Sequence, residues 1–134
     1  MNVQEVPLDL VNQVLPLTEH HLAAAFEFTD DYTLEEARVY LSTGAWSLIV
    51  AFDEPRQFKG AAIVQYFNRP RDRVAFIIAL GGRWVTGKEN AEKLFAIFRA
   101  NGATSVEAAA RDEILKFWQK YALEKKYTII SATL

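Results

Sequence analysis

Hydrophobic and polar residues alternate along the chain with two different periods, and the change of period separates predicted helices from predicted strands. Near the N-terminus, residues 2–7 form a short predicted strand, and an apolar segment follows over residues 8–15. Pro16 interrupts that segment, because a proline lacks the amide hydrogen that a helix interior needs. We therefore predict that a separate helix begins at Thr18, as its N-terminal cap, and runs through Phe28.

A second helix carries a strong start signal. Thr33 is followed three residues later by Glu36, the spacing of a capping box, in which each side chain bonds an unpaired amide at the helix start. Gly44 marks the end of this helix. Its apolar residues fall on one predicted face, formed by Leu34, Ala37, Tyr40 and Leu41.

The period then changes from helical to strand-like. Residues 46–52, 60–67 and 73–80 are rich in apolar, β-branched and aromatic residues, and short polar turns at 53–59 and 68–72 separate them. Three strands joined by such turns predict an antiparallel meander.

The C-terminal half alternates helices with strands. Gly102 ends a predicted helix whose apolar face is formed by Ala91, Leu94, Phe95 and Phe98. We predict a strand over residues 103–110 and a last strand over 127–133, with a helix between them that begins at Asp112. The buried face of that helix is predicted to contain Ile114, Phe117, Trp118 and Tyr121.

This order of elements predicts a single α/β domain over residues 1–134. An antiparallel meander followed by β-α-β-α-β indicates a mixed sheet, because crossover helices join parallel strands. Such helices cover a sheet on both faces.

The composition narrows the classes of function. The 134 residues include no cysteine, which excludes disulfides, thiol catalysis and zinc–thiolate sites, and the net charge of −2 gives no reason to expect nucleic acid as a partner. The N-terminus has neither a basic start nor a sustained apolar run, so we expect no signal peptide and no membrane anchor. His20 and His21 are adjacent and diverge by about 100° on a helix, so we expect no metal site.

The stretch from Gly82 to Glu89 is the first candidate for chemistry. Gly82, Gly87 and Lys88 have the spacing of a phosphate-binding P-loop, but that motif requires a Ser or Thr after the lysine to ligate Mg²⁺. Glu89 occupies that position here, and its carboxylate repels phosphate. A nucleotide-hydrolysing site is therefore not expected.

The order of elements resembles the GNAT superfamily of N-acetyltransferases across the whole chain, and most of all the short GNAT-like proteins that tailed bacteriophages encode. The segments that carry the resemblance read RVAFIIALGGRWV, RANGATSVEAAARDE and ILKFWQKY. The resemblance implies a GNAT-like fold. It also implies a non-catalytic virion or assembly component, located in the virion or the host cytoplasm, that contacts other phage proteins or itself in an oligomeric assembly. Trp84, an aromatic residue in a polar loop, is the expected contact residue.

In active family members the loop after the fourth strand reads Arg/Gln-x-x-Gly-x-Gly/Ala, and its amides bind the pyrophosphate of coenzyme A at a helix N-terminus. If acyl-CoA is bound, the resemblance assigns its binding to Arg83, Thr86, Gly87, Lys88 and Asn90. Thr86 and Lys88 replace the two glycines, and in a shifted register Glu89 directs a carboxylate at the phosphates. We therefore expect that this loop is the remnant of a pyrophosphate-binding loop and that the protein binds no cofactor.

The catalytic helix of many family enzymes reads Phe-Tyr-x-Lys-x-Gly-Phe, and its tyrosine protonates the departing thiolate of the coenzyme. The matching residues 117–123 place Trp118 at the tyrosine position, so Tyr121 is the candidate general acid, or else a core aromatic. The fourth strand, residues 73–80, contains no Asp or Glu. Glu107 on the next strand is the candidate general base, or else an exposed or hydrogen-bonded strand residue.

Two alternatives to the assembly role remain open. The first is an acetyl-CoA-dependent N-acetyltransferase with a non-standard pyrophosphate loop. In such an enzyme the acidic N-terminal third would attract a cationic amine through Glu19, Asp30, Asp31, Glu35 and Glu36. The second is a small protein that binds a target in a bacterial host.

Overall fold

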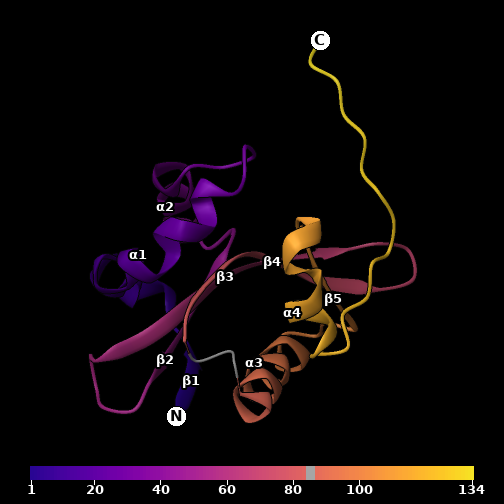
Figure 1. Ribbon diagram of the computed structural model, residues 1–134. Coiled ribbons are helices and arrows are strands. Elements are labelled where there is room, and N and C mark those ends of the chain that lie inside the picture. The colour runs from indigo at the N-terminus through magenta and orange to yellow at the C-terminus, as the bar shows by residue number, and fades with distance from the viewer. Residues whose placement is uncertain (84–86) are drawn as a thin grey trace.

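A mixed sheet lies at the centre of the molecule, with helices on both of its faces (Figure 1). The computed structural model describes residues 1–83 and 87–134. Within these residues the sheet has five strands in chain order, β1 (Asn2–Glu5), β2 (Ser47–Phe52), β3 (Phe58–Asn68), β4 (Arg73–Gly82) and β5 (Ser105–Ala108). Neighbours from β1 to β4 are antiparallel, and β5 is parallel to β4. The predicted meander and mixed sheet are confirmed.

Four α-helices within the described residues cover the sheet, namely α1 (Val11–Glu27), α2 (Leu34–Ser42), α3 (Lys88–Ala100) and α4 (Leu115–Gln119), and two 3-10 turns, η1 (Leu8–Leu10) and η3 (Asp112–Ile114), precede α1 and α4. α1 and α2 lie on one face of the sheet, and α3 and α4 lie on the other (Figure 1). The sheet has a hydrophobic core on each face. Side chains of alternate residues of β2 pack into one core or the other, because successive side chains of a strand point to opposite faces. Leu48 and Val50 pack under α1 and α2, whereas Ile49 and Ala51 pack under α3 and α4.

The first helix is longer than the sequence predicts. α1 begins at Val11 and continues through Pro16, and Thr18 lies buried inside it with its hydroxyl donating to the Leu15 carbonyl over 3.0 Å. Pro16 is on the exposed side, where water satisfies a carbonyl that loses its partner. The buried stripe of this helix runs through the proline and contains Val11, Leu15, Thr18 and Leu22. Burial of that stripe outweighs the roughly 3 kcal/mol that an interior proline costs.

The second helix follows its prediction closely. Thr33 caps α2, its side chain accepting from the Glu36 amide at 3.1 Å while the Glu36 carboxylate accepts from the Thr33 amide at 3.1 Å. Ala37 and Leu41 are buried as expected, but Tyr40 is 44% exposed and covers the buried Trp46 ring by stacking on it.

The last helix is shorter than predicted. α4 ends at Gln119, and Ala122 takes a left-handed backbone with φ of 65°. The Leu123 amide then donates back to the Trp118 carbonyl at 3.2 Å, and the Ala122 amide donates to the Gln119 carbonyl at 3.1 Å. These two bonds form a Schellman motif, which stops a helix. Trp118 is buried as predicted, whereas Ile114 is 46% exposed, so its predicted place on the buried face is wrong.

The predicted final strand over residues 127–133 is wrong. These residues run as an extended chain away from the body and pair with none of the described strands (Figure 1). A strand exists only where a neighbouring edge accepts its hydrogen bonds, and strand-forming residues alone do not supply that edge.

Candidate functional site

β4 and β5, the last two strands of the sheet, pair along only part of the length of β4. Their parallel pairing begins at Val74 with Ser105 and ends at Ile77 with Ala108. β4 continues to Gly82, and among the described residues no other strand takes the place of β5 beside its last part. The sheet is therefore open where β4 approaches the loop before α3.

A β-bulge lies at the point of parting. Ile63 on β3 pairs with Ala79, and the next residue, Val64, pairs with Ile77, so Ile78 is an extra residue in β4. A bulge bends its strand and increases the local twist, and bulges are frequent beside active sites. The bend at Ile78 turns β4 away from β5.

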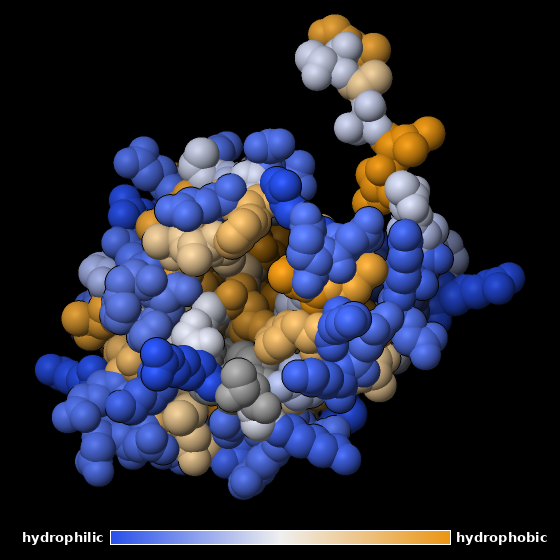
Figure 2. Space-filling view, viewed as in Figure 1, coloured by the Kyte–Doolittle hydropathy of each residue, from blue (hydrophilic) through white to orange (hydrophobic). Residues whose placement is uncertain are grey.

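The opening is visible as a hollow on the surface. Figure 2 shows it in the middle of the face, between the side formed by α1 and α2 and the side formed by α4, with hydrophobic residues on its floor and hydrophilic residues around it. Arg111, which follows β5, donates from Nε and Nη2 to the carbonyl of Phe28 at 3.2 and 3.1 Å. Phe28 is the C-cap of α1, so this contact ties the two sides together. No local pattern predicts this role of Arg111, because the contact joins residues that are 83 positions apart.

Gly81 and Gly82 have structural roles. A Cβ on Gly81 would lie 1.6 Å from the His21 carbonyl oxygen in α1, and Gly82 has φ of 96° with the Lys59 carbonyl 2.3 Å from the place of a Cβ. Only glycine permits this approach of α1 to the end of β4. The fold itself thus requires glycine at position 82.

The N-terminus of α3 is the best candidate for holding an anion. Gly87 is its N-cap without a side-chain cap, and Lys88 is the first helical residue. Among the described residues, a Cβ on Gly87 would meet only the Asn90 amide group, at 3.7 Å, so this part of the chain leaves space above Gly87. Arg83 is exposed at the end of β4. Helix-start amides and two cationic side chains favour a phosphate group here. Thr86 and Trp84 lie outside the described residues.

Glu89 does not point where its sequence position suggested. Its side chain is 85% exposed and pairs with Lys93, one turn further along α3, at 3.5 Å. An i,i+4 pair of this kind holds the carboxylate along the helix surface rather than over the helix start. The expected repulsion of phosphate by Glu89 is therefore weaker than the sequence implied.

Glu107 has two cationic partners. Its carboxylate accepts two hydrogen bonds from the Arg69 guanidinium, one of them at 2.9 Å, and one from Lys126 at 3.1 Å. The hydrogen bonds from Arg69, with the help of Lys126, lower the pKa of Glu107 to about 2. A carboxylate with so low a pKa is a weak proton acceptor at neutral pH. The geometry favours the hydrogen-bonded strand role over the base role.

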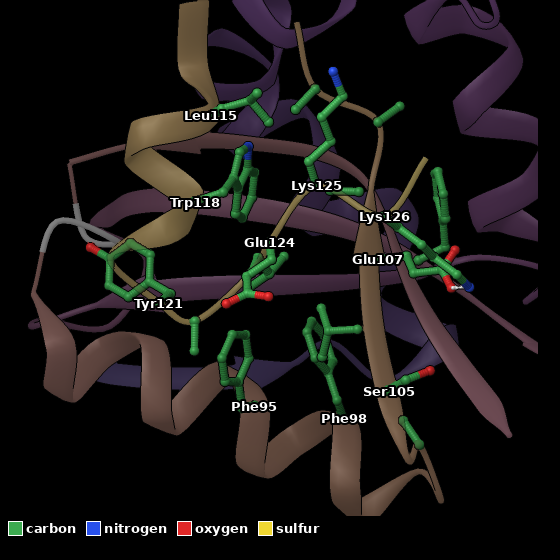
Figure 3. Close-up of a pocket in the computed structure, with 18 of the residues that line it drawn as sticks. Phe95, Phe98, Ser105, Glu107, Leu115, Trp118, Tyr121, Glu124, Lys125 and Lys126 are labelled. Atoms are coloured by element: carbon green, nitrogen blue, oxygen red, sulfur yellow. Dashed lines mark hydrogen bonds and ion pairs between the residues drawn. The ribbon is translucent and has the colours of Figure 1, made fainter. Parts of the chain in front are cut away.

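The two catalytic candidates are far apart. Tyr121 and Glu107 lie at opposite ends of the hollow drawn in Figure 3, and the Tyr121 hydroxyl points away from Glu107. Tyr121 is half-buried and packs edge-on against Phe117 at 5.5 Å between ring centroids. The structure thus does not bring Tyr121 and Glu107 together as an acid–base pair.

The hollow in Figure 3 is a cavity of about 1000 Å³ between α3, α4, β5 and the chain after α4. Phe95, Phe98 and Trp118 line it. Trp118 is buried, yet within the described part of the chain its indole nitrogen has no hydrogen-bond acceptor. The core under α3 and α4 is therefore incompletely filled.

Other kinds of site find no support in the described residues. Across residues 1–83 and 87–134, no group of His, Asp and Glu side chains is arranged to hold a metal ion. No helix in those ranges has the length and apolar character that a membrane crossing requires.

Several known structures with the same fold are acetyltransferases. An aminoglycoside acetyltransferase from an uncultured soil metagenomic sample, in complex with sisomicin, matches with a TM-score of 0.72 and 16% identity over 99% of this chain and 95% of its own. A predicted acetyltransferase from Clostridium acetobutylicum, with acetyl-CoA, matches with a TM-score of 0.67 and 9% identity over 98% of this chain and 95% of its own.

A third example is glucosamine-6-phosphate N-acetyltransferase from Arabidopsis thaliana, with a TM-score of 0.61 and 15% identity over 98% of this chain and 97% of its own. No family model matches the chain, and no curated protein matches it significantly in sequence. At these identities the likeness establishes the fold, and the GNAT-like α/β architecture expected from the sequence is confirmed. It does not establish the activity.

Proposed function

We propose that this protein binds acetyl-CoA in the opening between β4 and β5 and transfers the acetyl group to an amine. The observation that carries the proposal is the parting of the two strands at Ile77, next to a bulge and just before the N-terminus of α3. A ligand with an anionic group and a long polar chain suits a helix start that leads into an open strand edge. Acetyltransferases with this same fold, one of them with acetyl-CoA, support the assignment.

The residues at the α3 start fit a diphosphate. Lys88 and Arg83 supply positive charge, and the space above Gly87 admits a close approach to the backbone. Glu89 is held toward Lys93 and leaves that space open. The edge of β4 at residues 78–80, beyond its pairing with β5, is the place where the amides of a pantetheine chain would find backbone partners.

Acetyl-CoA supplies an activated thioester. The amine nitrogen forms a bond to the acetyl carbon, the carbon–sulfur bond breaks, the amine loses a proton and the departing sulfur gains one. Tyr121 is the proposed donor of that proton, because it lies just after α4, which forms one side of the opening. Glu107 is held ionised by Arg69 and Lys126 and is a weak proton acceptor, so we propose that the protonated amine gives its proton to solvent water as it enters and attacks as the neutral amine.

The acceptor is proposed to be a cationic amine in solution. Asp30 and Asp31 are exposed in the turn after α1. They lie close in sequence to Phe28, whose carbonyl binds Arg111 at the opening. Their charges attract a protonated amine to this rim, and the acidic N-terminal third noted in the sequence thereby gains a role.

The test is release of free thiol from acetyl-CoA in the presence of aminoglycosides, amino sugars and simple diamines. We expect turnover with at least one amine. Tyr121→Phe should lower kcat while leaving the affinity for acetyl-CoA unchanged, since the phenyl ring keeps the packing against Phe117. Unchanged kcat in this variant would remove Tyr121 from catalysis, and no turnover with any amine would count against the enzyme itself.

The assembly role finds no support in the comparisons, which contain acetyltransferases. The exposed C-terminal chain is a feature that favours a protein contact, and it requires no phage particle.

A further inference from the structure

The C-terminal tail, residues 127–134, is unusually exposed for its composition. Ile129 is 78% exposed, Ile130 is 90% exposed and Tyr127 is 58% exposed. Within the described part of the chain, its backbone makes no hydrogen bond. The tail contains no proline, glycine or charged side chain. Exposed segments of this kind pair readily with free strand edges, so the tail needs a partner surface.

A matching surface is present on the same molecule. β5 is the last strand of the sheet, and among the described residues only β4 pairs with it, so its outer edge is open. The cavity of about 1000 Å³ adjoins this strand. Its lining includes the apolar side chains of Phe95, Phe98, Val106 and Trp118 beside charged ones, and the first residues of the chain's own tail, 127–129, also border it. An added strand would satisfy the edge of β5 and cover these side chains.

Lys126, the residue just before the tail, is held beside β5 of its own chain. Lys126 donates to Glu107 at 3.1 Å, and Arg69 holds the same carboxylate. From there the chain leaves the body, and its C-terminal end lies far from β5 (Figure 1). The apolar part of the tail is thus presented outward, where another molecule can receive it.

We propose that the tail of one copy adds as a strand to the outer edge of β5 in a second copy, and that the two copies exchange tails reciprocally. The tail has strand-forming residues and unpaired backbone groups, and the open edge of β5 offers matching backbone groups beside the apolar side chains of the cavity. Exchange of identical segments about a twofold axis closes the assembly at two copies, because each tail fills the site that the other leaves. β-augmentation of this kind takes its affinity from backbone hydrogen bonds.

The test is the mass of the full chain in solution by light scattering after size exclusion, at high micromolar concentration. We expect a dimer with twice the 15.2 kDa of one chain. The double variant Ile129→Asp/Ile130→Asp should be a monomer with an unchanged circular dichroism spectrum, because both side chains lie outside the folded body. A chain that stops after Lys126 should also be monomeric.

The matched control places two aspartates on exposed apolar positions elsewhere, in Leu17→Asp/Val39→Asp, whose parent side chains are 49% and 62% exposed. This control should remain a dimer. A monomeric wild-type chain would overturn the proposal, and so would a tail variant that stays dimeric. Loss of the dimer in the control as well would show that the tail is not the contact.

Discussion

The two faces of the sheet are covered to very different degrees. Under α1 and α2 the core is closed: Leu22 and Leu41 are fully buried, and α1 approaches β4 so closely that Gly81 admits no Cβ. Under α3 and α4 a cavity remains, the indole nitrogen of Trp118 lacks an acceptor among the described residues, and the chain after α4 leaves the body.

This difference in packing indicates that the face under α1 and α2 serves stability, whereas the face under α3 and α4 serves function. A closed core gains free energy from burial and tight packing, whereas a site needs a surface that a ligand or a partner completes. α1 and α2 hold β4 in place, and the open half presents the end of β4, the start of α3 and the edge of β5. The chemistry proposed for this protein lies on the side where packing is incomplete.

The largest effect should come from a matched pair of leucine substitutions, one for each face. Leu22→Ala on the closed face should cost about 3–5 kcal/mol of unfolding free energy, because the side chain is fully buried and its cavity cannot collapse. Leu123→Ala, half-buried beside the cavity, should cost only about 1 kcal/mol. Urea unfolding of both variants measures the difference, and equal losses would mean that the two faces are equally well packed.

A smaller loss of stability is expected when Glu107 is replaced. Its carboxylate pairs with Arg69 and with Lys126, the residue just before the C-terminal tail. The folded pKa of Glu107, about 2, lies below the roughly 4.3 of an unfolded glutamate, so ionised Glu107 stabilises the fold above that higher value. The contribution is lost as pH falls toward the folded pKa. Glu107→Gln should therefore lower the melting temperature at pH 7, and the difference from wild type should shrink between about pH 4.3 and pH 2.

The matched control for Glu107 is Glu92→Gln. Glu92 pairs with Arg99 at 4.0 Å, and both side chains are at least 60% exposed, so this variant should melt like the wild type. A pH-independent loss in Glu107→Gln would indicate a packing role instead of an ionic one.

The smallest expected effect is an increase in the free energy of unfolding. Ala122 holds a left-handed backbone at the end of α4, a conformation that strains any residue with a Cβ. Ala122→Gly removes the strain but adds chain entropy to the unfolded state, and we expect a net stabilisation of about 0.5–1 kcal/mol. A loss of stability, again by urea unfolding, would show that the α4 terminus is not formed as described.

Local signals in the sequence predicted the parts of the fold that depend on local interactions. The capping box of Thr33 and Glu36 needs only residues three positions apart, and the meander needs only short turns between strand-like runs. α1 was predicted too short, because the penalty of Pro16 is local while the buried stripe that overrides it belongs to the tertiary core. The last strand was predicted wrongly because its partner edge lies outside its own sequence.

The candidate site was predictable only in part. Sequence position placed Lys88 and Asn90 at a helix start, where the structure has them. It also placed Glu89 over that start, but the pairing with Lys93 directs the carboxylate elsewhere. The bulge at Ile78 and the contact from Arg111 to Phe28 depend on strand register and on the approach of distant segments. No local residue pattern in the chain predicts either feature.

Binding of acetyl-CoA tests the central claim most directly, by the shift of the melting temperature. Ligand at 100 times its Kd stabilises a fold by about 2.7 kcal/mol, which corresponds to a rise of roughly 5–15 °C for a domain of this size. We predict such a rise for the wild type and for Arg71→Glu, a control at the far end of the β3–β4 hairpin, and little or none for Arg83→Glu/Lys88→Glu. The absence of a rise in the wild type, or an equal rise with inorganic pyrophosphate, would contradict the account.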